Sequence, residues 1–193
     1  MSTRVLPLAP AIVAALALVA TSAAATRPSP KTLVLRLRDL PSGFGVQTTT
    51  NYTIQGAASD GGVTVRQLRA WGYVAAYEVD FARAIEVPKT ARGIFGVYSF
   101  ANTFASPNGA HSRWVRRVGD CKHYRVLPLA TKIGDATRLC SGTITVASRV
   151  VQAYFVIWTH RNVFETLLAY GNKGRVTPGQ AVALAKRQDA RMG

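Results

Sequence analysis

The alternation of side chains over residues 71–81 limits what this chain can fold into more than any other segment. Every second residue there is aromatic or aliphatic, and Glu78 and Asp80 have the opposite parity. The alternating residues are Trp71, Tyr73, Ala75, Tyr77, Val79 and Phe81. A period of two is typical of a β-strand, whose successive side chains point to opposite faces. We therefore predict a strand here, with a helix as the alternative because nearby alanines tolerate one.

Other segments carry the same β-rich composition. They are rich in Val, Ile, Leu, Tyr and Phe, which strands favour, and the last two are separated by a predicted turn at 160–162. The predicted strands are 33–38, 94–101, 122–129, 136–140, 143–158 and 163–170. Residues 46–62 are polar and predict a loop with room for a short edge strand.

Two helices are predicted from their start signals. Ser106 followed by Pro107 is typical of an N-cap and first helical residue, and Thr177 with Gln180 forms a capping box. The strands come in runs rather than in strict alternation with helices, which indicates the α+β class. We expect a single domain with a mostly antiparallel sheet of five to seven strands and two helices packed on one face.

The N-terminus resembles a secretory signal peptide. One positive charge, Arg4, precedes an uncharged apolar run over 5–20, and small residues follow. We expect residues 1–25 to be the signal peptide, cleaved near Ala25, with 26–32 as a linker and 33–193 as the globular domain. An uncleaved anchor is the alternative. The predicted location is secreted or in the cell envelope, outside the cytoplasm.

The two cysteines, Cys121 and Cys140, predict a disulfide because an exported chain meets an oxidising environment. Two buried free thiols are the alternative. His123 lies near Cys121, but no second Cys or His has ligand spacing near Cys140, so no metal site is expected.

The charge is strongly positive, with 24 Lys and Arg against 9 Asp and Glu, or +15 at pH 7. Such an excess bears on partners and solubility. A group of basic residues is a candidate anion-binding site, with three of them on or beside the polar face of the middle helix and two on the next predicted strand. Its members are Arg113, Arg116, Arg117, Lys122 and Arg125. We expect an anionic envelope polymer, lipid headgroups or another envelope protein as the partner, and no nucleic acid; an ordinary solvated face is the alternative.

No catalytic, metal or cofactor motif stands out, so we expect no enzyme activity and no cofactor. A small secreted hydrolase remains the alternative, with a site built from His111 and Asp120 or from His160 and Glu165. Glu78 and Asp80 share one strand face, where we expect them to be solvated or paired with Arg.

Several short motifs in order resemble a known group of proteins. They are RDLPSGF at the start of the domain, AWGYVAAYEVDF, GAHSRW on the middle helix, IGDATRLC, and ALAKRQDAR on the last helix. Together they resemble small secreted actinobacterial proteins of unknown function. In plan these are similar to envelope lipoproteins and extracellular sensor-type domains. The resemblance implies an α+β envelope protein and supplies no catalytic residues. Unlike the lipoproteins, this chain has no lipid-accepting Cys near the predicted cleavage site.

These observations favour a non-enzymatic binding or sensing module of the cell envelope. The alternatives are the hydrolase above and a purely structural envelope component.

Overall fold

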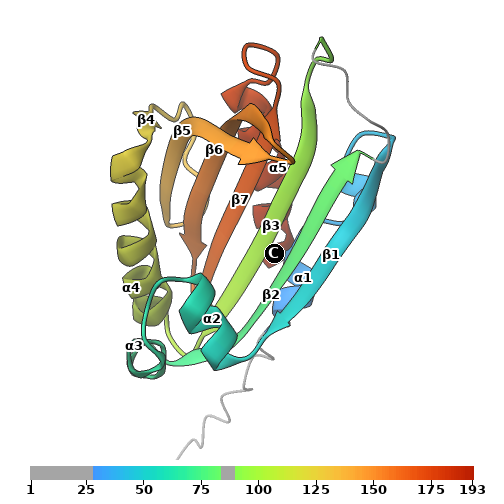
Figure 1. Ribbon diagram of the computed structural model, residues 1–193. Helices are drawn as coiled ribbons and strands as arrows, with labels where there is room; N and C mark the ends of the chain where they lie inside the picture. Colours follow the sequence, from blue (N-terminus) through green and yellow to red (C-terminus); the bar gives the residue numbers. More distant parts are fainter. Residues whose placement is uncertain (1–27, 84–89) are drawn as a thin grey trace, which may run out of the picture.

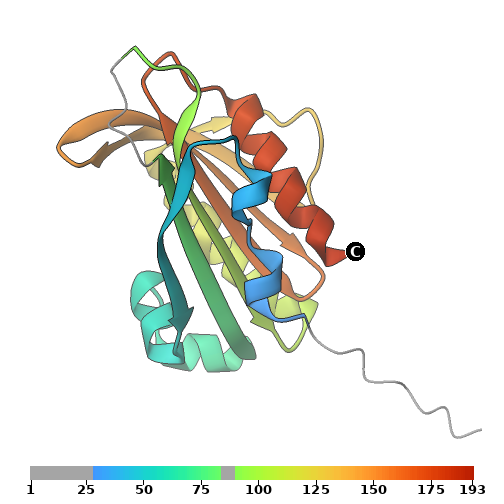
Figure 2. The ribbon, with the colours of Figure 1, turned by 90° about the vertical axis from the view of Figure 1, so that its right-hand side faces the viewer.

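The computed structural model describes residues 28–83 and 90–193 and places them in a seven-stranded antiparallel sheet with helices on both faces (Figures 1 and 2). The order across the sheet is β1-β2-β3-β7-β6-β5-β4. The strands are β1 (Phe44–Tyr52), β2 (Tyr73–Arg83), β3 (Ile94–Phe104), β4 (Arg125–Leu127), β5 (Ala136–Val146), β6 (Arg149–His160) and β7 (Val163–Gly171). The predicted α+β class, single domain and antiparallel sheet are confirmed.

The helices of the described residues are short except for two. They are α1 (Pro30–Leu33), α2 (Ile54–Asp60), α3 (Val65–Ala70), α4 (Pro107–Val118) and α5 (Pro178–Asp189), with 3-10 helices η1 (Leu37–Asp39), η2 (Gly119–His123) and η3 (Ala190–Met192). Both predicted helices are present with the expected caps. The Ser106 side chain accepts a hydrogen bond from the Gly109 N–H, and Thr177 and Gln180 form the capping box.

The alternating segment forms β2, as predicted. The strand begins at Tyr73, because Trp71 closes α3 and Gly72 follows in the left-handed region with φ 72°. β2 lies between β1 and β3. Val79 contributes to the core beneath α5, and Ala76 contributes to the core beneath α4. Both faces of this strand are therefore covered.

The placement of both helices on one face is wrong, because α4 and α5 cover opposite faces of the sheet (Figure 2). The physical reason lies in the central strands. On β7, Leu167 belongs to the core beneath α5 and Phe164 to the core beneath α4. A central strand that is apolar on both sides needs a covering layer on each.

The strand predicted at 33–38 is also wrong. Residues 30–33 form α1, and the chain then crosses the α5 face of the sheet. Leu33, Val34 and Leu35 are all buried, so the segment is enclosed on both sides rather than alternating. The Leu35 N–H donates to the Ser99 hydroxyl at 3.0 Å, which replaces a strand partner. Helix α1 also takes up the last residues of the predicted linker.

The polar stretch 46–62 holds more structure than a loop. β1 pairs with β2 over most of its length as an edge strand, and α2 follows it. The Thr53 hydroxyl caps α2 by accepting the Gly56 N–H at 3.1 Å. The expected edge strand is therefore present, and it is longer than expected.

The predicted strand 143–158 is two strands, the end of β5 and most of β6. They are joined at Ala147 and Ser148, which have φ of 44° and 64°, and Val146 pairs with Arg149. Positive φ at both central residues is the geometry of a type I′ hairpin. Neither residue is a Gly, Asn or Asp, so the turn had no sequence signal.

The predicted signal peptide over 1–25, its cleavage near Ala25 and the start of the linker lie outside the described residues. Within the described residues, no helix has the length and hydropathy that crossing a membrane requires.

Candidate functional site

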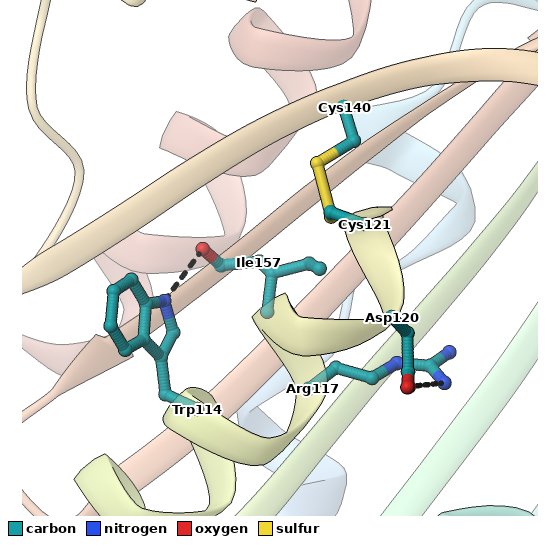
Figure 3. The surroundings of a disulfide bond; sticks show 6 residues. All are labelled: Trp114, Arg117, Asp120, Cys121, Cys140 and Ile157. Atoms are coloured by element: carbon teal, nitrogen blue, oxygen red, sulfur yellow. Dashed lines mark hydrogen bonds and ion pairs between the residues drawn. A yellow bond between two sulfur atoms is a disulfide. The ribbon is translucent and has the colours of Figure 1, made fainter. Parts of the chain in front are cut away.

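Helix α4 carries the first part of the predicted anion-binding group. Ala110, Trp114 and Val118 lie on its inner face and contribute to the core beneath it, as predicted. The Trp114 indole N–H donates to the Ile157 carbonyl of β6 at 3.3 Å (Figure 3). This bond and the apolar stripe hold α4 against the sheet.

Arg113 does not belong to an exposed site, which corrects its predicted place. It is buried, and its Nη1 donates to the Gly61 carbonyl at the end of α2 at 3.0 Å. Its guanidinium lies 5.4 Å from the centre of the Phe164 ring. Burial, followed by the neighbouring Arg117, lowers the Arg113 pKa to about 10. The reason is helical spacing: position 113 is three residues after Ala110 and falls within the same inward stripe.

Arg116 and Arg117 both contact Asp120. Arg116 Nη1 lies 2.8 Å from Asp120 Oδ1, and Arg117 Nη1 lies 3.2 Å from Asp120 Oδ2. Arg116 also donates to the Gly62 carbonyl at 3.1 Å. Lys122 and Arg125 follow on η2 and β4 and are exposed. We call Arg116, Arg117, Lys122 and Arg125 the basic surface.

The predicted disulfide is confirmed. Cys121 on η2 is bonded to Cys140 on β5, with 6.1 Å between the Cα atoms (Figure 3). Both cysteines are buried at the edge of the core beneath α4. The bond ties the end of α4 and the start of the basic surface to the sheet.

A cavity of about 370 Å³ lies beside the disulfide. Arg117, Asp120 and His123 contribute polar groups to its wall, and Tyr124 and Phe155 contribute rings whose centres are 4.7 Å apart. Gly142 makes room for Tyr124, because a Cβ there would lie 2.3 Å from its ring. An aromatic wall with a guanidinium and an imidazole can hold a polar group of a ligand and cover its less polar part.

Glu78 and Asp80 lie on the same face of the sheet, and neither is paired with Arg among the described residues. Glu78 is buried rather than solvated, and the Tyr52 hydroxyl donates to it. Burial raises the Glu78 pKa, while hydrogen bonds from Tyr52 and Tyr98 act in the opposite direction. Asp80 accepts a hydrogen bond from Thr48 Oγ1 at 2.9 Å. The expectation that Glu78 is solvated or paired with Arg is therefore wrong.

The two predicted hydrolase pairs are not assembled. His111 stacks on Trp114, with ring centres 5.5 Å apart, while Asp120 is occupied by the arginines described above. His160 Nδ1 lies 2.9 Å from Asp189 Oδ1 on α5, and Glu165 accepts a hydrogen bond from Gln188. Over residues 28–83 and 90–193, no group of three or more His, Cys, Asp or Glu side chains is arranged to hold a metal ion.

Comparisons with known proteins add information on the fold. No protein-family model matches the sequence, and no curated protein matches it. Among solved structures, the chain is similar to the extracellular domain of PknH from Mycobacterium tuberculosis. The match covers 83% of this chain and 94% of that chain, with a TM-score of 0.50 and 11% sequence identity. The likeness shows a shared fold, and that fold occurs in an extracellular domain.

Proposed function

We propose that this protein is a non-enzymatic binding module that works outside the cytoplasm and holds a phosphate-rich anionic polymer or headgroup of the cell envelope. The observation that carries the proposal is the basic surface, of which Arg117 also lines the cavity beside the disulfide. Lys122 and Arg125 are exposed there with no ion pair among the described residues.

The location outside the cytoplasm is supported by two independent features. The disulfide between Cys121 and Cys140 is a bond that persists in oxidising compartments. The fold is shared with a domain described as extracellular. The predicted signal peptide agrees with both.

The arrangement suits a polyanion better than a single small anion. Asp120 balances one of the two charges of Arg116 and Arg117, so the charge that remains on the basic surface is spread along α4, η2 and β4 rather than focused at a point. Basic residues near an anionic surface contribute about 1 kcal/mol each. Binding of this kind depends on several simultaneous contacts and weakens with salt.

Co-sedimentation of the purified protein with isolated cell walls and with anionic and neutral liposomes, across a salt series, tests the proposal. The test variant combines Arg116→Glu, Lys122→Glu and Arg125→Glu. Its matched control makes the same change of charge with Lys31→Glu, Arg38→Glu and Lys186→Glu, which are exposed residues on α1, η1 and α5.

We expect the test variant to lose at least tenfold in binding and the control to lose much less. If the wild-type protein sediments with cell walls, the anionic groups belong to a wall polymer. If it sediments with anionic liposomes, they belong to lipid headgroups. Equal losses in both variants would show a response to net charge alone, and absence of binding at low salt would overturn the proposal. A milder variant with Gln at the same three positions tests the surface if the reversed one does not fold.

A further inference from the structure

We propose that a groove on the α5 face binds an amphiphilic anion, a molecule with one hydrocarbon chain and a phosphate or carboxylate headgroup. The groove has a volume of about 410 Å³, within the range of roughly 300–1,000 Å³ typical of small-molecule sites. It lies between α5, the end of β2, the start of β3 and the turn before β1.

The floor of the groove is apolar. Pro41, Ile94, Ala183 and Leu184 line it, and the last two come from α5. Gly93 also borders the groove. Its φ of 83° lies in the left-handed region that favours glycine. A hydrocarbon chain in this groove would cover side chains that otherwise meet water.

The groove also has a basic part, which we call its rim. It consists of Arg83, Arg92 and Arg187, and no acidic residue of the described part of the chain lines the groove. None of the three forms an ion pair with another described residue. Arg187 donates to the backbone carbonyl of Asp39, whose carboxylate is paired with Arg191. The positive charge of the rim is therefore not balanced by the described part of the protein.

Arg83 contributes a guanidinium to the groove lining, and we expect an oxyanion to contact it. Its Nε is buried and has no hydrogen-bond partner within the described residues, while its guanidinium lies 5.7 Å from the centre of the Phe44 ring. A buried donor without a partner costs free energy that an acceptor would recover. A guanidinium presents several donors in one plane and matches phosphate or carboxylate oxygens.

The apolar residues and the arginines that line the groove together define the class of ligand. Arginines alone would suit any anion, and the apolar floor alone would suit any hydrocarbon, but a molecule that satisfies both must be amphiphilic. This site lies on the opposite face of the sheet from the basic surface, so it does not depend on the proposed function.

Calorimetric titration of the purified protein with decyl phosphate, below its critical micelle concentration, tests the proposal. Inorganic phosphate supplies the headgroup alone, decyl maltoside supplies the chain without a charge, and decanoate replaces the phosphate by a carboxylate. We expect decyl phosphate or decanoate to bind at least tenfold more tightly than either partial probe. If inorganic phosphate binds as tightly as decyl phosphate, or if no amphiphile binds, the proposal is wrong.

Variants locate the site. Arg187→Gln and Arg83→Gln should each weaken decyl phosphate binding about tenfold, and Ala183→Trp should do so by filling the groove. Arg38→Gln and Lys186→Gln remove exposed charges outside the groove and should change the affinity less than twofold. Arg187 and Ala183 are exposed on α5, so their variants test the site if Arg83→Gln does not fold.

Two outcomes separate this inference from the proposed function. The Arg116→Glu, Lys122→Glu and Arg125→Glu variant should keep its affinity for decyl phosphate even if it no longer binds cell walls. Decyl phosphate binding that survives both Ala183→Trp and Arg187→Gln but is lost in the charge-reversed variant would assign the ligand to the basic surface and overturn the inference.

Discussion

Glu165 is a fully buried carboxyl group beneath α5. Gln188 Nε2 donates to its Oε1 at 3.1 Å, and Gln188 Oε1 accepts from the Ser99 hydroxyl at 2.6 Å. Burial raises the pKa of Glu165 to about 8, and the Gln188 hydrogen bond only partly opposes this. At neutral pH the carboxyl is therefore mostly protonated, and it links β7 to α5 as a neutral group.

Because its folded-state pKa is above the ordinary value of a Glu, Glu165 makes stability depend on pH. Folding takes up a proton between the two pKa values. This contribution to stability is complete below the ordinary pKa, decreases as the pH rises toward about 8, and is constant above it. Glu165→Gln should remove this dependence, on the order of 3 kcal/mol between pH 5 and pH 9.

Urea unfolding of wild type and variant at pH 5, 7 and 9 measures the difference. Asp120→Asn, which changes a partly exposed carboxylate to its amide, is the control and should keep the wild-type slope. A Glu165→Gln variant with the wild-type slope would mean that Glu165 is ionised in the folded protein.

At the scale of elements, two arginines on α4 bond to the same turn between α2 and α3, one from the interior and the other from the surface. Arg113 donates to the Gly61 carbonyl from the interior, and Arg116 donates to the Gly62 carbonyl from the surface. Both bonds join α4 to the turn between α2 and α3. A buried group that loses its partner costs much more than an exposed one.

We therefore predict unequal costs for the same substitution. Arg113→Ala should lower the free energy of unfolding by about 2–4 kcal/mol, because it removes buried volume and leaves the Gly61 carbonyl without this donor. Arg116→Ala should cost less than about 1 kcal/mol. Chemical denaturation of both variants measures the difference, and similar costs would contradict the burial of Arg113.

At the scale of the whole molecule, the disulfide links η2, which follows α4, to strand β5 of the sheet. It joins residues that are 19 positions apart in the chain. In the chain-entropy model, closing a loop of about 20 residues contributes about 3 kcal/mol. Of the seven strands, only β4 and the first part of β5 lie within this loop. The other strands and α5 lie outside it, so the fold should persist without the bond.

Cys121→Ala combined with Cys140→Ala should lower the free energy of unfolding by about 3 kcal/mol while leaving the far-UV circular dichroism unchanged. Wild-type protein in reductant should lose a similar amount, whereas the variant should not respond to reductant. Mass spectrometry of the exported protein under non-reducing conditions should detect no free thiol, and two alkylated cysteines would contradict the bond.

Much of the local structure could be predicted from sequence. The alternation in β2, the capping signals of α4 and α5 and the pairing of the two cysteines each depend on residues near one another in the chain or on a simple count. These features set the fold class, most strands and both long helices. The hairpin at Ala147 and Ser148 was missed because its positive φ values are held by the pairing of β5 with β6 rather than by turn residues.

Only the tertiary structure decided which side chains share an environment. The periodicity of apolar residues and the capping signals show where a helix begins and which of its faces is apolar. They do not show which face of the sheet the helix covers, so the faces covered by α4 and α5 could not be predicted. The burial of Arg113 depends on Gly61, the setting of Glu78 on Tyr52, and the groove at Arg83 and Arg187 on the packing of α5 against β3. In each case the contacts join residues tens of positions apart, and local patterns carry no signal for such contacts.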